Sequence, residues 1–249
     1  IGKFGSSAAE ALKSTILVYD AFNEIFDLSK NNENAKDIIH SWAEAEWFKN
    51  KPSLANEIPL TVYKVSGETN TDDFSPAKEA WSRPDIPLHA QAFLKFSENM
   101  ESPLEKLEEL KQDGSKLVFV GDVVGTGSSR KSAANSMLWH MGQDIPCVPA
   151  KRTGGFCFGN KIAPIFFNTL QDSGALPIEL DVDNLDHGKK IILKPYDGQV
   201  LDADTLDFIS TFEFKSDVIF YEVQACGRIN LIIGRQLTDK TREKLDLPP

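Results

Sequence analysis

Residues 121–136 of the chain, GDVVGTGSSRKSAANS, follow directly on the apolar run KLVFV and carry residue types that can bind an anion. Gly125 and Gly127 can adopt positive φ angles, which let a ligand approach the backbone. A helix that begins just after them would direct unpaired N–H groups and the positive end of its dipole at that ligand. Arg130 can hold a carboxylate or a phosphate through two hydrogen bonds. The stretch therefore predicts an anion-binding turn.

A purely structural interpretation of the same turn stays open. The helix is expected to begin at Ser128 or Ser129, and a serine at that position often serves only as a cap. The pattern does not match a nucleotide site, because the glycine-x-glycine-x-x-glycine fingerprint needs glycine where Arg130 stands. A P-loop would need a Gly-Lys-Ser/Thr ending, which is also missing here. We therefore expect no nucleotide site.

A second group of polar residues lies earlier, in GETNTDDFSP (residues 67–76) and WSRPDIP (residues 81–87). Asp72 and Asp73 precede a Ser-Pro pair, where aspartate is a common turn residue. Arg83 stands before a proline, which favours extended backbone and would preset the arginine as a carboxylate ligand. Most loop arginines are simply solvated, so the spacing alone leaves both interpretations open.

The remaining candidates for chemistry are three cysteines and two histidines near the motifs. Cys147, Cys157 and Cys226 form no Cys-x-x-Cys pair and have no histidine at ligand spacing, so we expect reduced thiols and no metal site. His89 and His140 are interpreted as structural histidines, which are more common than catalytic ones.

Composition excludes several classes of protein. The chain has 249 residues, 41% of them hydrophobic, and a formal net charge of -10, which argues against non-specific binding to nucleic acid or to an anionic membrane. No apolar run approaches the roughly 18 residues of a membrane span, and no signal peptide opens the chain. We expect a cytoplasmic protein. Because the first residue is isoleucine, we also expect a segment of a longer polypeptide.

The elements that must position these residues follow from periodicity and turn residues. Residues 7–48 have a helical pattern broken at NNEN, and strand-like alternation starts near residue 58. We therefore expect a helical lead-in over residues 1–56 and a second domain over 57–249. In that domain the pattern predicts an α/β arrangement that is richer in strands toward its end. The expected elements are helices near 88–97, 103–112, 129–141 and 162–171, and strands at 117–120, 145–148, 176–180, 190–193, 199–201, 208–214 and 231–233.

Four motifs taken together closely resemble the swivel domain of the bacterial aconitase B (aconitate hydratase B) family. They are GETNTDDFSP, AWSRPDIPLH, the GSSR turn at residues 127–130, and IAPIFFN at residues 162–168. The likeness extends over nearly the whole chain, including the helical lead-in that ends SWAEAEWF. It implies an aconitase-type swivelling β/β/α domain preceded by a short helical segment. The chain departs from the wider superfamily at Asp73, where the Thr-Asp-His-Ile-Ser element has histidine.

The resemblance implies an isomerase that converts citrate to isocitrate through cis-aconitate around a [4Fe-4S] cluster. In that scheme Ser128 is the base that removes the proton from carbon. Arg83 and Arg130 hold carboxylates of the tricarboxylate substrate, with Ser129 beside them, and Asp72 orients a neighbouring group by hydrogen bonding. A serine hydroxyl becomes an effective base only where its alkoxide is stabilised, and a guanidinium and helix N–H groups in a closed site supply that stabilisation.

The same resemblance places the cluster's cysteine ligands in other domains of the same polypeptide, so none of the three cysteines here is assigned to the cluster. We therefore expect this segment to be inactive alone. Activity on 2-methylisocitrate (hydration of 2-methyl-cis-aconitate) and homodimer formation are left open by the sequence.

Two alternatives remain. The small subunit of isopropylmalate isomerase shares this type of domain and performs the same chemistry on a different acid, but it would normally begin as its own chain. A non-catalytic domain that docks RNA or a protein partner belongs to another class. The net charge of -10 and the lack of a basic stripe argue against RNA.

Overall fold

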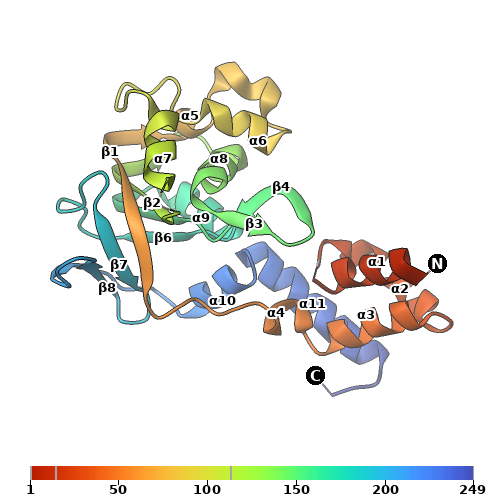
Figure 1. The fold of residues 1–249 in the computed structure, drawn as a ribbon. Coiled ribbons are helices and arrows are strands. Elements are labelled where there is room, and N and C mark those ends of the chain that lie inside the picture. Colours follow the sequence, from red (N-terminus) through yellow and green to blue (C-terminus); the bar gives the residue numbers. More distant parts are fainter. Residues whose placement is uncertain (1, 15, 113, 249) are drawn as a thin grey trace.

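The computed structural model describes residues 2–14, 16–112 and 114–248, and its centre is a seven-stranded mixed sheet (Figure 1). The strand order is β6-β5-β2-β1-β7-β8-β9, and a separate two-stranded hairpin pairs β3 with β4. The strands are β1 (Ile58–Asn70), β2 (Leu117–Thr126), β3 (Gln143–Ile145), β4 (Val148–Thr153), β5 (Phe156–Ile162), β6 (Leu176–Glu179), β7 (Lys190–Lys194), β8 (Gln199–Asp202) and β9 (Phe208–Thr211).

Two halves of different pairing make up the large sheet. Strands β1, β2, β5 and β6 are parallel, whereas β7 pairs antiparallel with β1, and β8 and β9 continue as an antiparallel meander. Parallel neighbours need long crossovers, which here carry helices, and the meander needs only short turns. The carboxyl ends of β1 and β2 consequently lie side by side at one edge of the sheet.

Helices fill the connections and form a separate group at the start of the chain. They are α1 (Gly2–Ser14), η1 (Ile16–Ala21), α2 (Phe22–Ser29), α3 (Glu33–Ala43), α4 (Glu46–Lys49), α5 (Thr71–Phe74), η2 (Ala77–Ser82), α6 (Ile86–His89), η3 (Ala90–Ala92), α7 (Pro103–Lys111), α8 (Lys131–Met141), α9 (Pro164–Asp172), α10 (Val218–Gln224) and α11 (Arg228–Lys244). Among the described residues, no helix combines the length and the apolar character that a membrane crossing requires.

The two faces of the sheet bury different sets of side chains, because successive residues of a strand point to opposite sides. Along β2, Leu117 and Phe119 enter the core beneath α5, α7, α8 and α9. Val118 and Val120 enter the core on the other face, which also contains residues of β7, β8 and α10. The continuous apolar run therefore reflects a strand that is buried on both faces, as is usual in parallel sheets.

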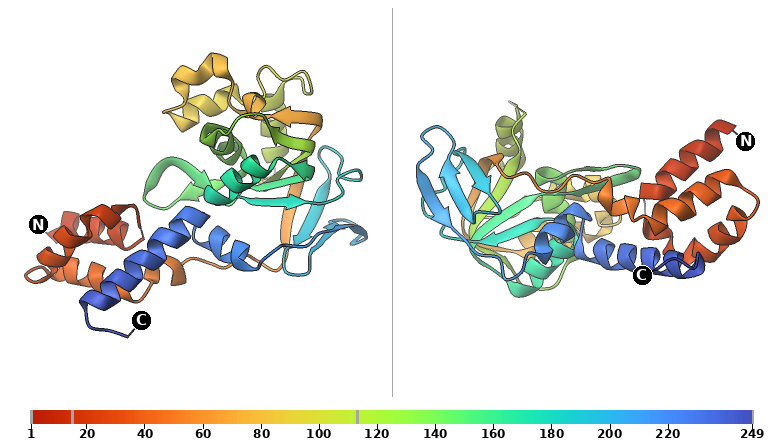
Figure 2. Two further views of the ribbon diagram at one scale, coloured as in Figure 1. Left: turned by 180° about the vertical axis from the view of Figure 1, so that it is seen from behind. Right: turned by 90° about the horizontal axis from the view of Figure 1, so that it is seen from below.

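A third core joins the two ends of the chain. Helix α11 packs along α3 and η1 (Figures 1 and 2), and residues from both ends share one apolar cluster. The Trp47 indole N–H donates to the Thr238 hydroxyl at 2.9 Å, and that hydroxyl donates to the carbonyl oxygen of Trp42 at 2.9 Å. The domain boundary near residue 56 stays a prediction. In the structure, α11 at the end of the chain packs against the helical lead-in rather than against the sheet.

Two expected strands are wrong. Residues 231–233 lie within helix α11, where the buried residues Leu231, Gly234 and Leu237 recur every three residues and Ile232 is exposed. A short run of leucine and isoleucine does not distinguish a strand from a helix by itself. Residues 145–148 do not form one strand: Ile145 ends β3, Val148 begins β4 and pairs with Ile145, and the turn between them contains Cys147 with a φ of 62°.

Candidate carboxylate-binding site

The segments that carry the predicted site residues follow β1 and β2, two neighbouring parallel strands. Asn70 at the end of β1 pairs with Thr126 at the end of β2. The chain leaves β1 into α5 and leaves β2 into the 127–130 loop, so both segments lie at the same edge of the sheet. In open α/β sheets, ligands bind beyond the carboxyl ends of the strands. The sheet thus brings together two motifs that lie more than fifty residues apart in the chain.

Helix α5 begins with a capping box. The Asn70 side chain accepts from the backbone N–H groups of Asp72 and Asp73, and the Asp73 carboxylate accepts from the Asn70 N–H at 2.8 Å. This reciprocal arrangement satisfies donors that the first turn of a helix leaves unpaired. Asp73 therefore has a structural role in this cap, as its turn context indicated.

The loop after β2 depends on its glycines. Gly125 has a φ of 77°, and a Cβ there would lie 2.1 Å from the Phe166 ring. Gly127 has a φ of 91°. Helix α8 begins at Lys131, and Arg130 is its N-cap. The expected start at Ser128 or Ser129 is therefore too early in the chain. Neither serine caps the helix, because both precede its N-cap.

The two predicted arginines converge on one backbone oxygen. Arg83 Nη2 donates to the carbonyl oxygen of Ser75 at 3.3 Å, and Arg130 Nη1 donates to the same oxygen at 3.1 Å. Arg130 also forms an ion pair with the Asp72 carboxylate, whose other contact is the backbone N–H of Ala77 at 3.1 Å. The side chain of Arg130 is 18% exposed and that of Asp72 is 53% exposed. Two guanidinium groups therefore share a small region with one half-exposed carboxylate.

The backbone of Arg83 differs from the expectation. It has φ -53° and ψ -34°, which is helical rather than extended, because it closes the 3-10 helix η2 and donates its N–H to Ala80. The preference that a following proline imposes is overruled by this turn and by the contacts of the guanidinium with Ser75. The arginine is held both by its backbone in this turn and by the contacts of its side chain with Ser75.

Behind the arginines lies a buried network of hydroxyls around one imidazole. The Ser75 hydroxyl is 2.7 Å from His89 Nε2 and 2.7 Å from the Ser132 hydroxyl, and it accepts from Arg83 Nε at 3.2 Å. His89 Nδ1 is 2.8 Å from the Ser82 hydroxyl. The network joins α5, η2, α6 and α8.

Ser128 and Ser129 lie at the front of the site, and both are exposed. The backbone of the loop is held by the Thr71 hydroxyl, which donates to the carbonyl oxygen of Ser128 at 2.9 Å. Within the described part of the chain, neither serine hydroxyl makes a hydrogen bond, so both are available to a ligand in front of Arg130.

Charge and burial shift two titratable groups at the site. A hydrogen bond from Arg130 is the main cause that lowers the pKa of Asp72, so this carboxyl is ionised at neutral pH. Burial, and next the positive charge of Arg83, lower the pKa of His89, so its imidazole is neutral at neutral pH. Both shifts leave the site with two fixed positive charges and one negative charge.

Sequence reasoning missed two residues of this site, Ser75 and Ser132, and interpreted His89 as a structural histidine without naming its contacts. Ser75 ends the same TDDFS element that contains Asp72, and Ser132 lies two residues beyond Arg130. The usable signal was the presence of short polar side chains just after two neighbouring parallel strands. Only the packing of α8 against α5 and α6 shows that these residues meet.

The cysteines do not offer a cluster site. Cys147 is exposed, Cys226 is partly exposed, and Cys157 is fully buried in β5, where burial raises the pKa of its thiol. Cluster ligation requires thiolates, which such burial disfavours. The described residues contain no group of three or more His, Cys, Asp or Glu side chains that could hold a metal ion.

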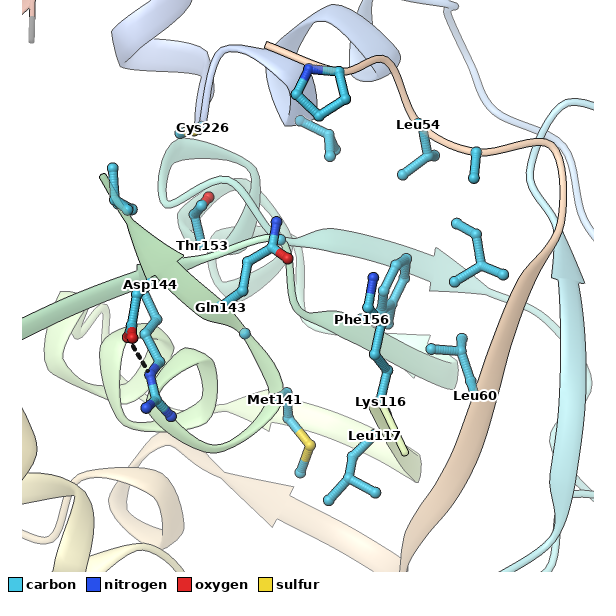
Figure 3. Close-up of a pocket in the computed structure, with 18 of the residues that line it drawn as sticks. Leu54, Leu60, Lys116, Leu117, Met141, Gln143, Asp144, Thr153, Phe156 and Cys226 are labelled. Carbon is cyan, nitrogen blue, oxygen red and sulfur yellow. Dashed lines mark hydrogen bonds and ion pairs between the residues drawn. The ribbon is translucent and has the colours of Figure 1, made fainter. Parts of the chain in front are cut away.

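A large hollow in the described structure lies elsewhere, at the amino ends of the parallel strands (Figure 3). It has a volume of about 1920 Å³, and Leu60, Leu117 and Phe156 line it near the starts of β1, β2 and β5. The β3–β4 hairpin, with its Asp144–Arg152 ion pair, borders the same hollow. None of the predicted site residues lines it.

The fold is an α/β domain in which arginines and serines lie just beyond two neighbouring parallel strands. A solved structure of 3-isopropylmalate dehydratase from Methanocaldococcus jannaschii has a TM-score of 0.56 with this chain at 17% identity, covering 75% of this chain and 99% of its own. At that identity the similarity shows the fold alone, and it confirms the expected fold class.

The family model described as aconitate hydratase 2 N-terminus matches residues 60–249, and the aconitate B N-terminal domain model matches residues 2–48. The chain belongs to the aconitate hydratase B family. It is 56% identical to aconitate hydratase B of Escherichia coli over 99% of its length, 57% identical to that of Synechocystis over 98%, and 52% identical to that of Helicobacter pylori over 96%. It spans only 30%, 28% and 28% of the length of these relatives.

Proposed function

We propose that this chain forms the carboxylate-binding part of an aconitate hydratase that converts citrate to isocitrate through cis-aconitate. The observation that carries the proposal is the convergence of Arg83 and Arg130 on the carbonyl oxygen of Ser75, near the exposed serines of the 127–130 loop. A tricarboxylate needs several fixed cations, and arginine binds carboxylates through two parallel hydrogen bonds. Membership of the aconitate hydratase B family supports this choice of substrate.

In this proposal Ser128 is the base that removes the proton from carbon, and Ser129 contacts the substrate beside it. Arg130, two residues further on, stabilises the negative charge that the Ser128 oxygen carries during the transfer. Asp72 keeps the Arg130 guanidinium in a defined orientation through its ion pair. Arg83 binds a second carboxylate from the opposite segment, so the substrate is clamped between the two loops.

The [4Fe-4S] cluster that this reaction implies does not fit the side chains described here, and we derive no step through it. Its ligands would belong to other domains of the same polypeptide, and the chain alone is proposed to be inactive. Hydration of 2-methyl-cis-aconitate and assembly into a homodimer remain further proposals that rest on the family likeness. Binding of RNA is not favoured, because the chain carries a net charge of -10.

The test is citrate–isocitrate interconversion by the full-length parent protein after reconstitution with iron and sulfide. Ser128→Ala should lower kcat by about 10²-fold or more, the usual effect of losing a general base. Ser129→Ala and Arg83→Ala should mainly raise KM, because they remove binding contacts. Near-normal turnover by Ser128→Ala would contradict the assignment of the base.

A second substrate separates this proposal from the main alternative. The wild-type parent should act on citrate and not on 3-isopropylmalate, the acid of the enzyme that shares the fold. Efficient turnover of 3-isopropylmalate would move the protein to that class. Because both acids carry carboxylates, the arginine contacts alone do not decide between them.

A further inference from the structure

The proton positions in the buried network behind the arginines follow from counting donors. The Ser82 hydroxyl is 2.7 Å from the carbonyl oxygen of Glu79, which can only accept, so the single proton of Ser82 is directed there. Ser82 must then accept from His89 Nδ1 at 2.8 Å. His89 therefore carries its proton on Nδ1.

The neutral imidazole has its acceptor on the other nitrogen. His89 Nε2, 2.7 Å from the Ser75 hydroxyl, accepts the proton of Ser75. Ser75 then has two lone pairs left, which accept from Arg83 Nε at 3.2 Å and from the Ser132 hydroxyl at 2.7 Å. The Ser75 oxygen thus uses its proton and both lone pairs, and both nitrogens of His89 are engaged, as expected for a well-ordered buried polar cluster.

We propose that His89 is a positioning residue of the carboxylate site: by accepting the Ser75 proton, it turns the Ser75 oxygen into the acceptor that fixes the Arg83 guanidinium. The inference rests on the proposed function, because it concerns how that site holds its substrate. His89 itself is 1% exposed, so a ligand in front of the arginines would not contact its ring. It acts through Ser75 alone.

The neutral state of His89 also suits the charges around it. Burial and the positive charge of Arg83 lower the pKa of this histidine, so it adds no third positive charge beside the two arginines. The carboxyl of Glu79, the nearest acidic group on η2, is engaged by Lys95 at 2.7 Å. With the opposite proton arrangement, the His89 Nε2–H would donate to the Ser75 oxygen and compete with Arg83 for its lone pairs.

Two substitutions of His89 separate its two contacts. Glutamine can place its amide oxygen near the position of Nε2 and keep an acceptor for Ser75. Asparagine is one methylene shorter, so its amide reaches only toward Ser82, and Ser75 loses its acceptor. In the reconstituted full-length parent, His89→Asn should raise KM for citrate about 10-fold more than His89→Gln does, with kcat affected less than KM.

His40→Asn, an exposed position on α3, is the matched control and should leave KM unchanged. Equal KM values for His89→Asn and His89→Gln, or a loss confined to kcat, would overturn the proposal. If both His89 variants had a lower melting temperature but the same KM, His89 would have a role in folding only, and the proposal would likewise fail.

A second measurement does not depend on activity. In the 249-residue chain, nitrogen NMR should show His89 with a protonated Nδ1 and an unprotonated Nε2, and the Arg83 Nε–H should exchange slowly with water. In His89→Asn the Arg83 Nε–H should exchange faster. If the parent protein does not turn over citrate but the NMR pattern is found, the proposed function fails while the positioning contact stands. A protonated Nε2 would overturn the inference whatever the activity.

Discussion

Arg83 and Arg130 share one acceptor, the carbonyl oxygen of Ser75, at 3.3 and 3.1 Å. The first arginine comes from the segment after β1 and the second from the loop after β2. Two guanidinium groups held this close repel each other, and among the described residues the ion pair of the Asp72 carboxylate is with Arg130. A carboxylate that binds between them would relieve the repulsion, which is the role proposed for this pair of arginines.

The two contacts of the planar Arg130 guanidinium group, with Ser75 and Asp72, predict that a lysine cannot replace this arginine. Arg130→Lys keeps the charge but loses the planar group that contacts Asp72 and Ser75 together, so KM for citrate should rise about 10-fold or more. Lys131→Ala removes the next cation, which is exposed on α8, and should change KM by less than about twofold. Steady-state kinetics of the full-length parent distinguishes them. An equal effect of both substitutions would indicate a diffuse electrostatic contribution instead of a defined contact.

Gly114 and Gly125 have the same φ of 77° but different surroundings. Alanine substitutions at the two positions therefore distinguish backbone strain from steric crowding. A Cβ on Gly125 would lie 2.1 Å from Phe166, whereas a Cβ on Gly114 would meet no atom within 4 Å. Gly114→Ala should therefore cost about 1–2 kcal/mol of unfolding free energy, the strain term alone. Gly125→Ala should cost about 3–5 kcal/mol, since overpacking adds to the strain. Urea unfolding measures both, and similar values for the two variants would contradict the close packing of the loop on α9.

His140 predicts a pH dependence of stability. Burial lowers its pKa to about 4 in the folded protein, against about 6.5 when unperturbed. The unfolded chain thus takes up a proton below pH 6.5 while the folded protein does not, so stability is full above pH 6.5 and falls as the pH decreases toward 4. At about 1.4 kcal/mol per unit, the loss from this residue between pH 7 and pH 5 is about 2 kcal/mol.

His140→Gln should reduce the loss of unfolding free energy between pH 7 and pH 5 by that amount. Urea unfolding at the two pH values, with wild type in parallel, provides the measurement. Parallel behaviour of the two proteins would show that His140 does not cause the slope.

The contact between α11 and the lead-in predicts that a glycine-to-alanine substitution in α11 destabilises the protein, the opposite of its usual effect in a helix. In a helix interior, replacing glycine by alanine normally stabilises by about 0.5–1 kcal/mol. A Cβ on Gly234 would lie 2.3 Å from the Trp47 ring, so Gly234→Ala should destabilise by about 1–3 kcal/mol. Gln236→Ala, exposed on the same helix, should change stability by less than about 0.5 kcal/mol. A stabilised Gly234→Ala protein would show that α11 does not pack here in solution.

The local elements were largely predictable because their signals lie close together in the chain. The apolar runs of β1 and β2, the proline at the start of α7, and Gly174 after α9 with its φ of 80° are local features. The failures occurred where tertiary contacts decide. Residues 231–233 become helical because Leu231, Gly234 and Leu237 face the lead-in, and Arg83 is helical because its turn and its side-chain contacts outweigh the effect of Pro84.

The sequence by itself determined the α/β class, the helical lead-in and the motifs that carry Asp72, Arg83 and the 127–130 turn, since each depends on residue type and short spacing. Only the tertiary structure decided which of these groups meet. Parallel pairing of β1 with β2 brings segments more than fifty residues apart to one edge of the sheet, and the packing of α8 on α5 and α6 closes the network around His89. Such contacts depend on distances between remote parts of the chain, which a linear pattern does not encode.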